Sequence, residues 1–119
     1  LLLIGFDEHG GTYDHVPPPP APHPDGSPTA GQMGFKFDRS GVRIPTIAVS
    51  AYIDERTVVN DEYRNTSLIR TLRERWPLGE PLTARDAIAR DIAPILTRET
   101  PRPQEDWPKV SAQPVPAFF

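Results

Sequence analysis

Two stretches of the chain have the hydrophobic pattern of strands. Residues 1–6 form an uninterrupted apolar run, and residues 42–50 are rich in β-branched side chains. Both patterns predict strands. Because the first run has no polar side, we expect it to be buried on both faces, as in parallel sheets covered by helices. Pro45 has no amide donor and therefore places the second strand at a sheet edge or a bulge.

A helix is predicted where apolar residues return at helical spacing. The positions on its apolar face are Leu68, Ile69, Leu72 and Trp76. Asn65 or Thr66 can cap the start of this helix, and Pro77 ends it. Arg70 and Arg73 could contact a phosphate, but a solvated charged face is the simpler interpretation.

A second, shorter helix is expected to begin after Thr83. A threonine followed three residues later by Asp86 resembles a capping box, in which the two ends of the first turn satisfy each other. We expect this helix to run to about Arg90, with Ala87 and Ile88 facing inward.

Proline dominates two further segments. Residues 17–28 and the tail from residue 100 are both proline-rich, which predicts extended or turning backbone. A stiff surface loop is the simpler interpretation of the first segment, with His23 exposed to solvent, although a ligand for an aromatic groove is an alternative. We expect the tail to lie on the body of the protein, anchored by Trp107 and by Phe118–Phe119.

Composition limits the possible classes of protein. The chain has 119 residues, of which 37% are hydrophobic and 16 are prolines, so we expect it to be poorly stable alone. It begins at Leu1, inside a predicted strand, which suggests a fragment or a processed chain.

The net charge of −3 argues against a nucleic-acid surface. Cysteine is absent, so no disulfide framework or thiolate metal site is available. The run of residues 1–6 is too short to span a membrane, and no signal peptide is visible.

Candidate chemistry lies directly after the first strand. Asp7, Glu8 and His9 follow the apolar run and precede Gly10 and Gly11. In open α/β sheets, ligands bind beyond the carboxyl ends of strands. These side chains could form a solvated loop or a metal site. Carboxylate oxygens suit Mg, Ca or Mn, and imidazole shifts the preference toward Zn or Fe. Two adjacent carboxylates can share an ion only if the chain leaves strand geometry, which the glycine pair allows.

A second acidic and imidazole pair follows in the same loop. His9 and His15 are candidates for orienting the metal ligands or for protonating a leaving group, and each could equally be a structural loop residue. Asp14 could orient His15 or close the turn as an Asx motif. Tyr13 is expected to pack against its neighbours.

Four segments together resemble one known family. They are FDEHGGTYDHVPPP at residues 6–19, FDRSGVRIP at 37–45, TSLIR at 66–70 and LTARD at 82–86. These motifs are similar to those of the bacterial and plant phosphoesterase family, which contains non-specific phospholipases C and acid phosphatases. The resemblance covers nearly the whole chain. The chain departs from the family pattern at Ala51, where a proline is common, and at Asn65, where a histidine is usual. Asn65 can still form hydrogen bonds but cannot titrate, which weakens any acid/base role there.

The resemblance implies a fold and a division of the chain. The expected fold class is α/β, the C-terminal part of an alkaline-phosphatase-like α/β/α sandwich with a mainly parallel sheet. Residues 1–99 would belong to the catalytic domain, with residues 17–34 as a proline- and glycine-rich loop, and residues 100–119 would form an extended tail. The missing N-terminal part of the same domain would be the main partner.

The resemblance also implies a function. Members hydrolyse phosphoesters at a metal centre, and Asp7 and Glu8 match residues that supply metal ligands there, whereas the nucleophile and the other ligands lie upstream. The expected substrate is a phospholipid head group or a phosphomonoester, and the divalent ion could be Ca, Mg, Mn, Zn or Fe. Resembling bacterial proteins are often secreted or periplasmic. The alternative is a non-catalytic remnant, or an interaction module that uses its proline-rich segments.

Overall fold

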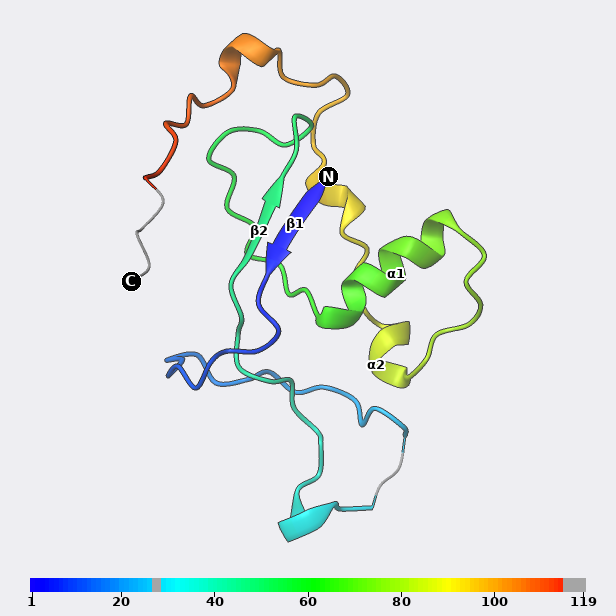
Figure 1. The fold of residues 1–119 in the computed structure, drawn as a ribbon. Coiled ribbons are helices and arrows are strands. Elements are labelled where there is room, and N and C mark those ends of the chain that lie inside the picture. The colour runs from blue at the N-terminus through cyan, green and yellow to red at the C-terminus, as the bar shows by residue number, and fades with distance from the viewer. Residues whose placement is uncertain (27–28, 115–119) are drawn as a thin grey trace.

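The computed structural model describes residues 1–26 and 29–114 and has mixed α/β character. Within those residues, the regular elements are two strands, β1 (Leu2–Gly5) and β2 (Thr46–Val49), and two α-helices, α1 (Asn65–Arg75) and α2 (Ala84–Ala87). Figure 1 shows the strands side by side, with both helices to one side of them. Short 3-10 turns at Gln32–Gly34, Ala93–Ile95 and Gln104–Asp106 complete the described structure.

The two strands form an antiparallel pair. Their register runs from Leu2 opposite Val49 to Gly5 opposite Thr46. Both predicted strands are therefore confirmed, and Pro45 lies directly before β2, outside the ladder, where its missing amide costs no sheet hydrogen bond. The parallel arrangement expected for this sheet is wrong for this pair. The α/β/α sandwich stays a prediction.

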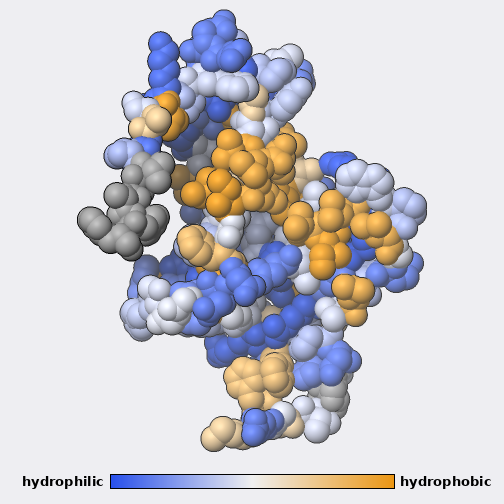
Figure 2. All heavy atoms as spheres, viewed as in Figure 1, coloured by the Kyte–Doolittle hydropathy of each residue, from blue (hydrophilic) through white to orange (hydrophobic). Residues whose placement is uncertain are grey.

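One face of the sheet is bare. Residues directly opposite each other in an antiparallel pair share a face, so Leu2, Ile4, Ile47 and Val49 point to the same side. Their exposed fractions are 56%, 48%, 59% and 51%. The expectation that the first strand is buried on both faces is therefore wrong for this chain, because no element of the described residues covers that side. Figure 2 shows the resulting apolar band across the sheet.

Helix α1 is capped from inside its first turn. The buried Ser67 hydroxyl accepts a hydrogen bond of 3.0 Å from the backbone N–H of Arg64, which precedes the helix. Capping by Asn65 or Thr66 is therefore wrong. Trp76 follows the last helical residue, and Pro77 prevents continuation as expected. The predicted apolar face of α1 remains half uncovered, with Leu68 49% and Trp76 57% exposed.

Helix α2 is fixed by its cap and by a buried ion pair. The Thr83 hydroxyl accepts from the backbone N–H of Asp86 at 3.1 Å, which confirms the Thr83 half of the predicted capping box. The other half is wrong, because the Asp86 carboxylate accepts from the backbone N–H of Leu82, at 2.8 Å, and not from that of Thr83. The Asp86 carboxylate is fully buried and binds the guanidinium of Arg73, on α1. The helix ends at Ala87 and not near Arg90, and both Ala87 and Ile88 are exposed instead of facing inward. The contact that joins the two helices is therefore the buried ion pair between Arg73 and Asp86.

The chain has little hydrophobic core of its own. In the described part, the buried apolar residues are Ala21, Ile53, Ala89 and Ile95. The Cα radius of gyration is 18.3 Å, whereas a compact domain of this length would have about 13.5 Å. The few buried apolar side chains and the open shape are what a chain of low stability would have, and the low stability of the chain alone stays a prediction.

The proline-rich loop is held by the helical region. Arg85 donates hydrogen bonds to the carbonyl oxygens of Pro22 and Arg39, at 2.8 Å each, and to that of Phe37. The His23 side chain is only 18% exposed and meets Phe37 edge-on, with ring centroids 5.7 Å apart. The expectation that His23 is solvent-exposed is therefore wrong.

The C-terminal tail follows the loop after β2. The backbone N–H groups of Arg98 and Arg102 donate to the carbonyl oxygens of Tyr52 and Ala51 at 3.1 and 2.8 Å. The Trp107 side chain is half exposed, and its indole N–H donates to the carbonyl of Arg102. The anchoring role expected for Phe118–Phe119 lies outside the described residues. No helix within the described ranges is long and apolar enough to cross a membrane.

Candidate functional site

The candidate site is built on the loop that follows β1. Gly10 and Gly11 adopt φ values of +66° and +76°, a left-handed conformation that costs glycine little. The backbone N–H of Thr12 donates to the carbonyl of His9 at 3.2 Å and closes the turn. The prediction that the glycine pair turns the chain sharply out of strand geometry is confirmed.

Asp7 and Glu8 lie exposed at the start of this loop. Oε2 of Glu8 is 3.5 Å from Nδ1 of His9, and no arginine or lysine of the described residues pairs with either carboxylate. No group of three or more histidine, aspartate or glutamate side chains gathers as a metal site within residues 1–26 and 29–114. Because a divalent ion takes more ligands than two carboxylates supply, these residues can form only part of a coordination sphere.

Two other Asp-Glu dipeptides provide an internal comparison. Asp54 binds Arg98 at 2.9 Å, and Glu55 binds Arg102 at 3.3 Å. The remaining dipeptide behaves in the same way: Asp61 binds Arg90 at 2.9 Å and Glu62 binds Arg64 at 2.8 Å. Asp7-Glu8 is therefore the Asp-Glu pair that the described residues leave without a guanidinium partner.

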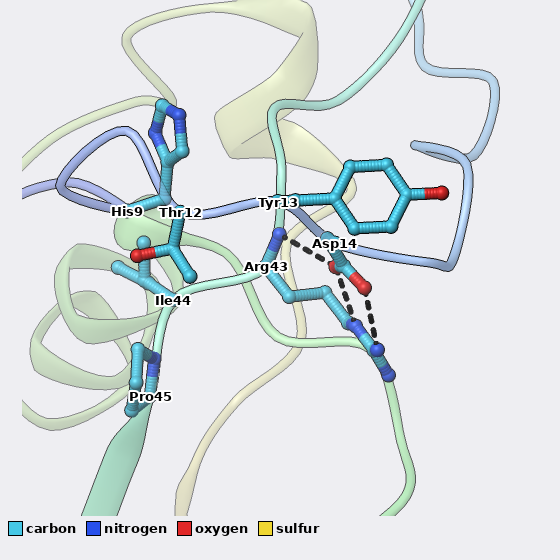
Figure 3. A pocket seen from close by; sticks show the side chains of 7 residues that line it. All are labelled: His9, Thr12, Tyr13, Asp14, Arg43, Ile44 and Pro45. Carbon is cyan, nitrogen blue, oxygen red and sulfur yellow. Dashed lines mark hydrogen bonds and ion pairs between the residues drawn. The ribbon is translucent and has the colours of Figure 1, made fainter.

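Asp14 and Arg43 form a tight ion pair beside the loop (Figure 3). Oδ2 of Asp14 accepts from Nε of Arg43 at 2.8 Å, and Oδ1 accepts from Nη2 at 2.7 Å. Oδ2 also accepts the backbone N–H of Arg43 at 3.3 Å, and Oδ1 that of Val16 at 3.0 Å. The Arg43 side-chain hydrogen bonds hold the pKa of Asp14 well below its usual range, assisted by the Val16 amide.

The other residues of the loop that were predicted from the sequence are Tyr13, Asp14 and His15. The Asp14–Val16 contact confirms the Asx turn, whereas Nδ1 of His15 is 3.9 Å from Oδ1 of Asp14, which is too long for a hydrogen bond. The His15 side chain is 82% exposed. Tyr13 is 88% exposed, so its expected packing role is wrong.

A shallow pocket of about 410 Å³ lies beside the loop. Its lining combines polar and apolar groups: His9, Thr12, Tyr13, Asp14, Arg43, Ile44 and Pro45. The structure thus brings His9 and Arg43 to one pocket but does not bring His15 there. Sequence reasoning missed Arg43. The available signal was its place in the second family-like motif, at residues 37–45.

The motifs and the loop they build define the class of protein. The chain belongs to the phosphoesterase family, whose model matches residues 1–79.

Individual relatives are phospholipases C from plants and mycobacteria. The chain is 37% identical to non-specific phospholipase C5 of Arabidopsis thaliana over 125 residues, which cover 97% of this chain and 24% of the relative. It is 41% identical to non-specific phospholipase C6 of the same plant over 119 residues, covering 91% of the chain and 23% of the relative. It is 31% identical to phospholipase C B of Mycobacterium tuberculosis over 129 residues, covering 95% and 25%. The chain therefore spans about a quarter of the length of the relatives it matches.

Proposed function

We propose that this chain forms part of the catalytic domain of a metal-dependent phosphoester hydrolase of the phospholipase C or acid phosphatase type. The family membership and the phospholipase C relatives support the reaction class. The observation that carries the proposal is the Asp7-Glu8 pair. Two other Asp-Glu pairs of the same chain are neutralised by arginines, and this one, at the end of a strand in the family motif, is not.

The donor set fits a hard divalent cation. Asp7 and Glu8 would hold the ion through carboxylate oxygens, which Mg, Ca and Mn prefer, and a histidine close by also suits Zn or Fe. A bound divalent ion supplies Lewis-acid stabilisation of the charge that develops on the phosphoryl oxygens. Asp14 is not part of this set, because its two oxygens already accept four hydrogen bonds.

The two histidines are not equally well placed. His9 lines the pocket and lies beside Glu8, so it is positioned to orient that carboxylate or to protonate a leaving oxygen. His15 does not line the pocket and is mostly exposed. The proposal therefore assigns the proton-transfer role to His9 and keeps His15 as the second candidate.

The bare sheet face supports a larger catalytic domain. Leu2, Ile4, Ile47 and Val49 present a contiguous apolar surface on one side of the sheet. Soluble proteins rarely leave large apolar patches uncovered. The relatives are about four times longer than the matched region, so we propose that the rest of the domain covers this sheet face.

The rest of the domain would also contribute the nucleophile and the other metal ligands. The substrate would be a phospholipid head group or a phosphomonoester. A secreted or periplasmic location remains an expectation from the family.

The interaction-module alternative is less well supported. In a proline-rich ligand of polyproline II conformation, the backbone carbonyl oxygens are solvated and make no internal hydrogen bonds. Those of Pro18 and Pro19 accept hydrogen bonds from Arg39 and from the backbone N–H of Ser40 in this chain, at 3.2 and 2.9 Å. The segment is therefore already used inside the molecule.

The test compares two matched double variants of the full-length protein. Asp7→Asn/Glu8→Gln removes the unpaired carboxylates, and Asp61→Asn/Glu62→Gln removes an arginine-paired Asp-Glu dipeptide. Hydrolysis of p-nitrophenyl phosphate and of phosphatidylcholine is measured with and without chelator, together with Mn²⁺ affinity. We expect the first variant to lose about 10²- to 10³-fold in activity, because a metal supplies several kcal/mol to the transition state. The control should retain activity.

The outcomes separate the hypotheses. Chelator-sensitive activity that disappears only in Asp7→Asn/Glu8→Gln supports the proposal, and the preferred substrate decides between the two enzyme types. Activity that survives both chelator and variant contradicts the metal role. A wild-type protein without activity toward either substrate would favour a non-catalytic remnant.

A further inference from the structure

The loop that carries Asp7 and Glu8 is fastened at both ends to one short segment. At its start, Gly5 of β1 is paired with Thr46 of β2. At its end, Asp14 is bound to Arg43, three residues before Thr46. Residues 6–13 therefore bridge two fixed points on the same stretch of chain.

The second attachment is the bidentate ion pair between Asp14 and Arg43, which we call the clamp. Arg43 presents Nε and Nη2 to the two oxygens of one carboxylate, a bidentate arrangement that only arginine can form. The Asp14 side chain is 10% exposed, although Arg43 is 61% exposed. With its backbone contacts to Val16 and Arg43, the carboxylate has no accessible lone pair left for an ion.

The loop has little else to hold it. Between Phe6 and Tyr13, the described structure contains one internal backbone hydrogen bond, from Thr12 to His9. Gly10 and Gly11 have more backbone freedom to lose on ordering than any other residue type. Without the clamp, the loop would therefore be fixed only at its β1 end.

We propose that Arg43 and Asp14 are positioning residues that close the loop and hold Asp7, Glu8 and His9 in the geometry needed for metal binding. The inference rests on the proposed function, because it assigns the clamp to the metal site. Neither residue needs to touch the metal or the substrate for this role.

The experiment uses Mn²⁺ alone as the probe and the full-length protein. The variants are Asp14→Asn, Arg43→Gln, their combination, and Arg43→Lys. The lysine keeps the positive charge but cannot form the bidentate contact. The matched control is Asp61→Asn/Arg90→Gln, an aspartate–arginine pair that is also 29 residues apart in sequence but is exposed on both sides. Mn²⁺ affinity is measured together with hydrogen exchange of the Thr12 amide, which donates to the carbonyl of His9.

We expect each clamp variant to weaken Mn²⁺ binding by about 10- to 100-fold, the usual effect of losing groups that orient metal ligands. The combined variant should be no worse than either single one, because both remove the same contact. Arg43→Lys should retain part of the affinity, and the control should retain all of it. Exchange of the Thr12 amide should accelerate in the clamp variants alone.

Three results would overturn the clamp. These are unchanged exchange, unchanged Mn²⁺ affinity, or a rise in KM for Arg43→Gln without either effect, which would make Arg43 a substrate contact. Failure of the proposed function is seen separately. If Asp7→Asn/Glu8→Gln leaves Mn²⁺ affinity unchanged, the metal assignment falls, and the exchange data alone then decide whether the clamp orders the loop.

Discussion

The same dipeptide, Asp-Glu, has opposite environments in two regions of this molecule. At residues 54–55, between β2 and α1, both carboxylates bind arginines: Asp54 binds Arg98, just before the C-terminal tail, and Glu55 binds Arg102, within it. Thr97 also donates to Asp54, and these contacts lower the pKa of Asp54, chiefly through the Arg98 hydrogen bond. At residues 7–8, after β1, the carboxylates have no guanidinium partner within the described ranges.

The difference shows that local sequence does not decide what a carboxylate does. Asp54 and Glu55 fasten the tail because Arg98 and Arg102 are brought to them from more than forty residues away. Asp7 and Glu8 are exposed in the loop after β1, and no arginine of the described residues binds them. A charge without an internal partner is what an external cation requires.

The largest expected effect extends the comparison to a buried carboxylate. Asp86→Ala should lower the free energy of unfolding by about 3–5 kcal/mol, because it leaves the guanidinium of Arg73 buried without its partner. Asp7→Ala should leave it nearly unchanged. Urea unfolding of the full-length variants measures both.

The control for this prediction removes both charges. Arg73→Met/Asp86→Leu should recover much of the stability lost in Asp86→Ala, since no unpaired charge remains. Equal destabilisation by Asp7→Ala and Asp86→Ala would mean that the two carboxylates do not differ as described.

Acid should remove the stabilisation that the Asp86 carboxylate provides. The hydrogen bond from Arg73, assisted by the Leu82 amide, lowers the pKa of Asp86 in the folded protein. Its contribution is therefore complete above the unfolded pKa of about 3.9 and disappears as the pH falls through the lower folded value. The difference in unfolding midpoint between wild type and Asp86→Asn should shrink below about pH 4. A difference that is constant with pH would contradict this assignment.

A positively charged side chain next to Asp7-Glu8 should make this dipeptide resemble the two Asp-Glu dipeptides that bind arginines. His9→Arg places a guanidinium beside Glu8, so we expect Mn²⁺ to bind about tenfold more weakly through competition and repulsion. His9→Gln is the neutral comparison and should have a smaller effect. Titration calorimetry distinguishes the two, and equal affinities would show that the charge near Glu8 is unimportant.

The smallest effect is expected at an exposed pair. Asp61 and Arg90 are 52% and 58% exposed, and such pairs contribute little because water and salt screen them. Asp61→Asn should change the free energy of unfolding by no more than about 0.5 kcal/mol. A loss above about 1 kcal/mol would show that surface pairs in this chain contribute more than usual.

Local features of the fold were predictable from sequence. The apolar run, the turn at the glycine pair and the Thr83 cap depend on neighbouring residues, and the structure has all of them. Burial was not predictable, because it depends on what lies against each element. The run at residues 1–6 has the composition of a covered strand, yet no described residue covers its outer face.

The candidate site was predictable only in part. Asp7, Glu8 and His9 were found because they are contiguous with each other and with the strand. Arg43 was missed because its partner is 29 residues away, and neither residue has a local feature that links it to the other. Arg73 was treated as a surface charge for the same reason, since its partner Asp86 belongs to the next helix.

The contacts of Arg85 have a consequence for how this protein can vary and be engineered. Its guanidinium holds the carbonyl oxygens of Pro22, Phe37 and Arg39, so both ends of the intervening loop are anchored to α2. Chain length between fixed anchors changes loop-closure entropy only slowly. The segment between Pro22 and Phe37 is thus a natural place for length differences among relatives, and for insertion of an epitope or a fluorescent label without disturbing the loop that follows β1.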